Sequence, residues 1–103
     1  MNVCPYVLSL AAESDLRNII RYTIRMWGEQ QSRAYVQQLE AAACDVAQGR
    51  GSFKLMDELR PGLRARRAGK HFLFCLPRQR RKAVILAILH ERMECLSILQ
   101  GRL

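Results

Sequence analysis

Residues 9–48, SLAAESDLRNIIRYTIRMWGEQQSRAYVQQLEAAACDVAQ, decide the fold because they predict two helices joined at a single glycine. Apolar side chains recur three and four residues apart in both halves, as on one face of an amphipathic helix. The first stripe comprises Ala12, Leu16, Ile19, Ile20, Thr23, Met26 and Trp27, and the second comprises Tyr35, Leu39, Ala42, Ala43 and Val46. Ser9 suits an N-cap, Gly28 suits a left-handed stop, and Gly49 and Gly51 end the second helix. So short a connection predicts an antiparallel helical hairpin.

Strands are predicted on both sides of the hairpin. YVLSL, residues 6–10, is a short candidate before it, and residues 50–62 form an irregular segment with one helical turn at most. Three strand-like segments then follow with short links, which predicts an antiparallel meander. They are LRARRA from Leu63, HFLFCLP from His71, which Pro77 is expected to stop, and AVILAIL from Ala83, with RQRRK as an exposed hairpin tip. The tail ECLSILQGRL suits a helix.

The expected fold class is therefore α+β in one domain over residues 1–103. An N-terminal strand precedes an antiparallel helical hairpin, and the hairpin packs on a mostly antiparallel sheet that a C-terminal three-stranded meander completes. At this length a second domain would have no core of its own.

Positive charge is concentrated in the second half of the chain. The net charge is +8, but residues 1–49 carry −1 and residues 50–103 carry +9. Such asymmetry indicates an anionic partner, either nucleic acid or an acidic protein segment.

Several function classes are excluded by composition and spacing. The longest apolar run, residues 83–89, is far shorter than the roughly 20 residues of a membrane span. The N-terminus lacks the pattern of a signal peptide, so we expect a cytoplasmic protein without a membrane partner. The four widely spaced cysteines predict free thiols, with Cys44 and Cys75 in the core. HERME, residues 90–94, lacks the second histidine of a HExxH zinc site, and we expect no metal or cofactor.

Four segments in their order and spacing resemble a known family. They are SLAAESDLRNIIRYT, WGEQQSRAYVQQLEAA, DELRPGLR and ILHER. The chain resembles the toxins of the ParE branch of the ParE/RelE superfamily, over nearly its whole length. The resemblance implies a helical hairpin on a sheet, inhibition of DNA gyrase without catalysis, and neutralisation by a cognate antitoxin in a toxin-antitoxin hetero-oligomer. Operator DNA is then bound only indirectly, through the antitoxin.

Two other functions are compatible with the same superfamily. The RelE branch comprises ribosome-dependent messenger RNA endonucleases, and a decayed toxin acts only as a corepressor. An endonuclease needs proton-transfer groups and cations near the scissile phosphate. The candidates here are Arg66, Arg67, His90 and Arg92. His90 is the one good proton-transfer group among them, and acidic Asp57 and Glu58 would repel a messenger backbone, so a binding function is favoured.

The resemblance also suggests two sets of binding residues. Phe72, Phe74 and Leu76 alternate with His71, Leu73 and Cys75, so both faces of that strand are apolar and one is expected to be left for a partner. The expected antitoxin contacts are Leu16, Ile20, Arg64, Arg66, Phe72, Phe74, Arg80 and Arg81. The expected target contacts are Arg60, His90, Arg92, Leu96, Leu99 and Arg102, the last three in a mobile C-terminal end. The structural alternative is that His90 closes the sheet edge by hydrogen bonding and Arg92 pairs with Asp57, Glu58 or a neighbouring carboxylate.

Overall fold

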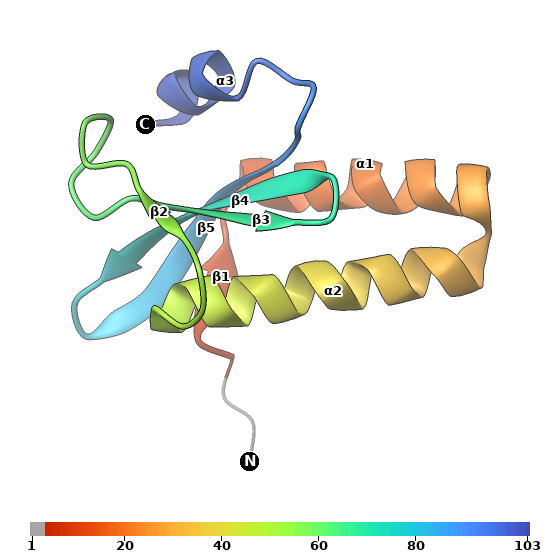
Figure 1. Ribbon diagram of the computed structural model, residues 1–103, viewed down its shortest axis with the longest axis horizontal. Coiled ribbons are helices and arrows are strands. Elements are labelled where there is room, and N and C mark those ends of the chain that lie inside the picture. The colour runs from red at the N-terminus through yellow and green to blue at the C-terminus, as the bar shows by residue number, and fades with distance from the viewer. Residues whose placement is uncertain (1–3) are drawn as a thin grey trace.

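The computed structural model describes residues 4–103 and confirms the expected order of strand, helical hairpin and meander (Figure 1). Residues 1–3, part of the stretch that lacks a signal-peptide pattern, lie outside the described residues. The elements are β1 (Tyr6–Leu8), α1 (Leu10–Trp27), α2 (Glu29–Gln48), β2 (Lys54–Leu55), β3 (Arg64–Ala68), β4 (His71–Arg78), β5 (Arg81–His90) and α3 (Cys95–Arg102).

The hairpin forms because each helix has a defined end. The hydroxyl oxygen of Ser9 accepts a hydrogen bond from the Ala12 backbone N–H at 3.0 Å and caps α1. Gly28 has φ 89° and ψ 168°, so the expected left-handed helical conformation is wrong there, although the positive φ still favours glycine. Its N–H donates to Ile24 and its carbonyl accepts from the Ser32 N–H, so one residue ends α1 and begins α2.

The sheet has the order β1-β5-β4-β3-β2, in which β1 runs parallel to β5 and the other neighbours are antiparallel. The predicted strand YVLSL ends early, at Leu8, because Ser9 begins the helix cap. The prediction that Pro77 stops its strand is wrong, since β4 continues to Arg78. A register shift between Leu76 and Arg78 accommodates the proline, which has no N–H to donate to the ladder. Residues 50–62 also contain β2, which the sequence did not indicate.

Each face of the sheet carries its own apolar core. On one face, α1 and α2 pack on Leu73, Cys75, Ile85 and Ile88. On the other face, α3 and the turn before β3 cover Phe74, Ala87 and Leu89 through Leu63 and Leu99 (Figure 1). The expectation that this second face is left open for a partner is therefore wrong, because the chain's own C-terminal helix occupies much of it.

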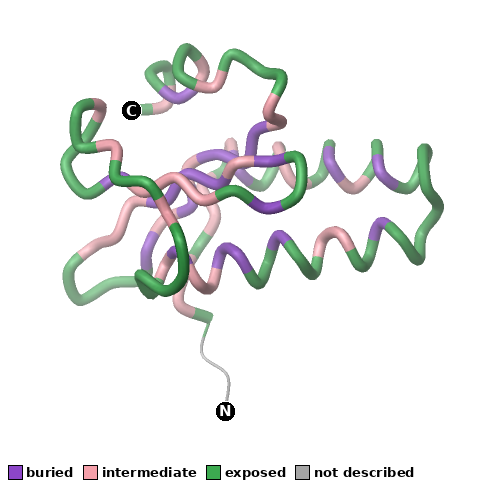
Figure 2. The backbone as a smooth tube through the Cα atoms, in the orientation of Figure 1, coloured by how far each residue is buried: buried purple, intermediate pink, exposed green. Residues whose placement is uncertain are grey.

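The hairpin is longer than the sheet it covers, so its far end projects (Figure 2). Met26 and Trp27, which the apolar stripe placed in the core, are 55% and 46% exposed. The hydroxyl groups of Thr23 and Ser32 lie 2.6 Å apart and join the two helices where both side chains are buried.

No helix within residues 4–103 has the length and apolar character to cross a membrane.

Candidate functional site

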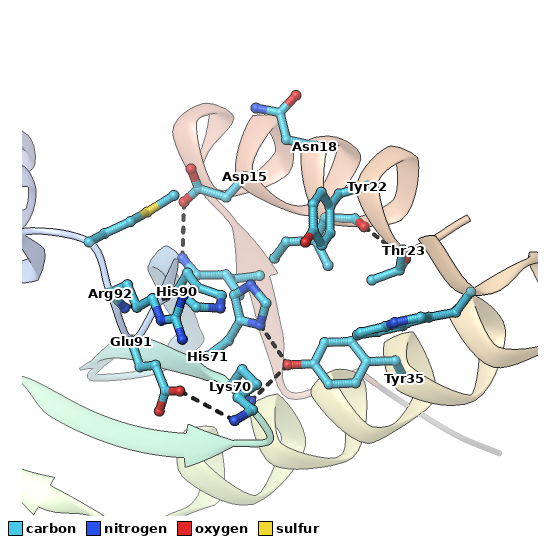
Figure 3. Close-up of a pocket in the computed structure, with 14 residues that line it drawn as sticks. Asp15, Asn18, Tyr22, Thr23, Tyr35, Lys70, His71, His90, Glu91 and Arg92 are labelled. Carbon is cyan, nitrogen blue, oxygen red and sulfur yellow. Dashed lines mark hydrogen bonds and ion pairs between the residues drawn. The ribbon is translucent and has the colours of Figure 1, made fainter. Parts of the chain in front are cut away.

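A cavity of about 610 Å³ opens between the far half of the hairpin and the adjacent end of the sheet (Figure 3). One wall is α1 with one residue of α2, and it consists of Asp15, Asn18, Ile19, Tyr22, Thr23, Trp27 and Tyr35. The opposite wall is the turn between β3 and β4 with the end of β5, and it consists of Lys70, His71, Ile88, His90, Glu91, Arg92 and Met93. An apolar and aromatic lining with a few polar groups is typical of a binding site.

Tyr35 connects α2 to the sheet at the base of this cavity. Its hydroxyl oxygen accepts from the Lys70 backbone N–H at 3.0 Å and lies 2.6 Å from Nδ1 of His71. The hydroxyl also lies 3.5 Å from the Ala68 carbonyl, so it can donate there or to Nδ1, and the tautomer of His71 decides which. Gly69 has φ 59°, and a Cβ there would lie 2.6 Å from the Tyr35 ring, so only glycine permits this close approach.

His71 contacts Tyr35 on one side and His90 on the other. The rings of His71 and His90 meet edge to face, with centroids 5.2 Å apart, and the two residues are register partners at the ends of β4 and β5. Burial and, to a smaller extent, the neighbouring His90 lower the pKa of His71 to about 4, against the opposing effects of Asp15 and Glu91. His71 is therefore neutral near pH 7 and a weak general base.

His90 and Arg92 both lie in the cavity wall. The hydrogen bond expected of His90 is present, but the ion pair expected of Arg92 is not. Nδ1 of His90 accepts from the Arg92 backbone N–H at 3.1 Å, as expected for a histidine that closes the sheet. The expected pairing of Arg92 with Asp57 or Glu58 is wrong. Asp57 instead accepts from the Gly62 N–H within its own turn, and Arg92 forms no ion pair in the described part of the chain.

Glu91 pairs with two basic side chains at the outer rim of the cavity. Its carboxylate accepts a hydrogen bond from Arg67 and lies 3.6 Å from Nζ of Lys70. The hydrogen bond from Arg67 lowers the pKa of Glu91, and the charges of Arg67, Lys70 and His90 lower it further. The negative charge of Glu91 thus offsets the positive charge of the two side chains that reach it.

The C-terminal helix is fixed to the fold, so the predicted mobile end is wrong. Arg102 donates two hydrogen bonds to the Asp15 carboxylate, at 2.6 and 3.0 Å, and a third to the Leu86 carbonyl. Asp15 also accepts from the Ile88 backbone N–H, so it joins α1, β5 and α3. Leu99 is fully buried, whereas Leu96 is 55% exposed. Of these three predicted target contacts, only Leu96 offers a free side chain.

Arg64 and Arg66, expected to meet the antitoxin, hold the end of α2 against β3. Arg64 donates to the Val46 carbonyl at 2.8 Å, and its guanidinium lies over the ring of Phe53. Arg66 donates to the carbonyls of residues 50 and 52 and lies 3.6 Å from the Asp45 carboxylate. Both guanidinium groups bind α2 or the loop after it and do not project freely.

The other expected antitoxin contacts differ in exposure. Arg80 and Arg81 are exposed at the hairpin tip between β4 and β5, where Arg80 has a positive φ of 58°. Phe74 is 3% exposed, so an antitoxin cannot reach it without moving α3. The half-buried side chains are Leu16, Ile20 and Phe72. Arg60, an expected target contact, is exposed in the turn before β3.

The four endonuclease candidates are not brought together. His90 and Arg92 line the cavity, but Arg66 reaches the C-terminal end of α2. Arg67 lies on the other face of β3, over the ring of Phe72, and meets only the rim of the cavity, at Glu91. An RNase site needs its proton-transfer groups and cations around one phosphate. This set therefore does not form one.

Comparisons with known proteins identify the family of this chain. The family model described as ParE toxin of type II toxin-antitoxin system, parDE, matches residues 6–95. The chain belongs to the ParE toxin family. It is 50% identical to a Toxin ParE of Escherichia coli over 98 residues, which cover 95% of each chain. It is 34% identical to a Toxin ParE1 of Mycobacterium tuberculosis and 33% identical to one of Caulobacter vibrioides, each over 86% of this chain and 91% of the relative.

Membership of the ParE family makes this chain the toxin of a type II toxin-antitoxin system, whose other component is an antitoxin. All four cysteines of this ParE-family chain are free thiols, with Cys75 buried as expected and Cys44 only partly buried. No cluster of three or more metal-ligating side chains exists among the described residues.

The sequence did not indicate the convergence of Tyr35, His71 and Asp15 in this ParE-family fold. Tyr35 was assigned to the apolar stripe and Asp15 was given no role, because periodicity reports only which face of a helix a residue occupies. The one available signal was Gly69 before Lys70, since a glycine in a tight turn also marks a close backbone approach.

Proposed function

We propose that this chain inhibits DNA gyrase by binding it, without catalysing a reaction, and that a cognate antitoxin neutralises it. Membership of the ParE family supports the proposal. The observation that carries it is the dispersal of Arg66, Arg67, His90 and Arg92, which do not meet around one phosphate as the groups of a phosphodiesterase must. A binding toxin needs only an exposed surface that fits its target.

The cavity is the surface that best fits a partner. Tyr22, Trp27 and Met93 are each about half exposed along it, which is uncommon for large apolar side chains unless a partner covers them. His90, Arg92 and Lys70 add cationic or hydrogen-bonding groups at its sheet side. An acidic antitoxin segment with an apolar or aromatic side chain would satisfy both parts.

Competition for this cavity explains neutralisation in the proposal. His90 and Arg92 are the expected gyrase contacts, and they lie in the same wall that the antitoxin would cover. The two partners would therefore exclude each other. The exposed Arg80 and Arg81 would increase the rate of antitoxin association, and a partly disordered acidic tail would become ordered on binding.

A messenger RNA endonuclease is the second candidate, and one observation favours it. Tyr35, Lys70, His90 and Arg92 line one cavity, so a proton-transfer group and two cations share a single space. Against it, the Tyr35 hydroxyl is already bonded to His71 and Lys70, and the pKa of Tyr35 is raised, chiefly by burial. Tyr35 is thus poorly placed to donate or accept a proton.

The decisive experiment compares gyrase inhibition with transcript cleavage by the same purified chain. Under the proposal, supercoiling by gyrase is inhibited, cleaved DNA accumulates, and ribosome-bound messenger RNA stays intact. The His90→Ala variant then remains toxic on strong induction, because losing one polar contact costs only about 1–3 kcal/mol. For an endonuclease, the same change would cost about 10² to 10⁴ in rate.

The matched control is His71→Ala, which removes the neighbouring, buried histidine, with circular dichroism as the test of folding. A folded His90→Ala chain that is harmless, together with cut transcripts from the wild type, would replace gyrase inhibition with nuclease activity. Inhibited supercoiling with intact transcripts supports the proposal, and growth without either effect indicates a decayed toxin.

A further inference from the structure

The outer edge of α1 carries a row of three arginines, Arg17, Arg21 and Arg25, which we call the arginine ridge. They recur every fourth residue, and all three are exposed. They lie on the side of the helix opposite the buried Ala12 and Ile19, because positions four apart share one helical face. The ridge is the most outward part of the helix.

The fold accounts for only part of the ridge, since Arg25 lies in the last turn of α1, where a cation is favourable. Like charges four residues apart repel each other and weaken a helix. None of the three guanidinium groups forms a hydrogen bond or an ion pair with any residue from 4 to 103, in contrast to Arg64, Arg66 and Arg67. Glutamine would form this helix nearly as well without the repulsion. The ridge is therefore better explained by a partner than by stability.

The chemistry of the ridge fits a phosphate backbone better than a protein surface. Protein interfaces depend on aromatic and apolar anchors at a desolvated centre. The aromatic residues of α1, Tyr22 and Trp27, line the cavity on another side of the helix, and the exposed apolar side chains beside the ridge, Leu10 and Ile24, are aliphatic. Successive ridge charges advance about 6 Å along the helix axis. Each guanidinium group can pair with a phosphate oxygen, and each phosphate of a DNA strand carries a single negative charge.

We infer that the arginine ridge binds the phosphate backbone of duplex DNA. Its role at gyrase rests on the proposed function: a toxin that traps the cleaved-DNA state meets both the enzyme and the DNA that the enzyme holds. The cavity then serves the protein partner and the ridge serves the DNA. Binding of this kind is independent of sequence, because phosphates carry no base information.

The test measures the salt dependence of binding to a labelled duplex of random sequence, with purified chain and no gyrase. The R17Q/R21Q/R25Q variant should lower the slope of log affinity against log salt by about 2 to 3, since each phosphate contact contributes about 0.9. The matched control, R33Q/R50Q/K54Q, removes the same charge at three exposed side chains that make no ion pair among the described residues. Its slope should stay near that of the wild type.

An equal loss of slope in both variants would overturn the inference, because binding would then reflect net charge alone. A ridge variant that binds duplex normally but has lost affinity for the antitoxin would also overturn it and assign the ridge to the antitoxin. Circular dichroism should show both variants folded, with the ridge variant no less stable than the wild type. A separate cleavage assay with gyrase tests the proposed function, whose failure leaves the duplex result unaffected.

Discussion

The hydroxyl of Tyr35 and Nδ1 of His71 lie 2.6 Å apart, and this contact ties the helical hairpin to the sheet at the base of the cavity. The two residues are 36 positions apart in the chain. Removing the hydroxyl would leave Nδ1 of His71 and the Lys70 N–H without their partner. The contact therefore supports the shape of the cavity as well as the stability of the fold.

Tyr35→Phe should lower the free energy of unfolding by about 1–3 kcal/mol, because it leaves a buried acceptor unsatisfied. Denaturant titration measures the loss. Tyr22→Phe is the matched control, since the Tyr22 ring is 56% exposed and its hydroxyl makes no hydrogen bond within residues 4–103. Equal stabilities of the two variants would show that the Tyr35 hydroxyl contributes nothing.

Stability should fall as the solution is acidified from about pH 6.5 toward pH 4. The pKa of His71 is lowered from 6.5 to about 4 in the folded chain, so between these values the unfolded chain binds more protons. Stability then rises with pH across this window and is complete above the unfolded pKa. Urea titrations at several pH values should show a shallower dependence for His71→Gln. An identical pH dependence in the variant would assign the effect to other groups.

The pair formed by Asp15 and Arg102 should be worth more than a surface ion pair, because both side chains are mostly buried. Either single change, Asp15→Asn or Arg102→Gln, should cost about 1–4 kcal/mol by leaving a partner with unmet hydrogen bonds. A double-mutant cycle of unfolding energies should give a coupling above about 1 kcal/mol. Additive losses would mean that the two side chains act independently.

The two leucines of α3 should separate stability from function. Leu99→Ala should cost about 2–5 kcal/mol, because the side chain is fully buried beneath the sheet. Leu96→Ala should leave stability nearly unchanged and reduce toxicity if Leu96 contacts gyrase. Truncation after Glu94, which a mobile tail would tolerate, should instead destabilise the chain. A stable truncated chain would contradict the packing of α3.

Charge reversal of Arg80 and Arg81 to glutamate should slow association with the antitoxin. The two side chains are exposed at a hairpin tip, where they act by long-range attraction. Stopped-flow measurements should show an association rate that falls and becomes less sensitive to salt, with little change in dissociation. An unchanged rate at low salt would remove these arginines from the encounter.

Much of the fold was predictable because its signals are local. The helical hairpin follows from the spacing of residues such as Ile19 and Leu39, and the meander follows from short links between apolar segments. The prediction that Pro77 ends its strand was wrong because a bulge can accommodate a residue without an N–H. The prediction of a mobile tail was wrong because Leu99 and Arg102 meet their partners, Leu89 and Asp15, only in the folded chain.

The candidate site was less predictable because it depends on distant residues. His90 and Arg92 were identified from the abrupt end of an apolar strand, and both line the cavity. Tyr35, His71 and Asp15 come from three other elements, and no local pattern brings them together. Arg64 and Arg66 looked free in the sequence, since a backbone carbonyl that accepts from them leaves no trace there.

The parallel pairing of β1 with β5 has a consequence for synthesis on the ribosome. Tyr6 to Leu8 are made before the helical hairpin, and their partners Ala83 to Ile85 are made after it. The growing chain therefore carries a completed helical hairpin whose apolar face has no finished sheet to cover it until β5 emerges. A fragment that ends before β5 would lack the strand on which β1 and β4 pair, so we expect it neither to fold nor to poison the cell.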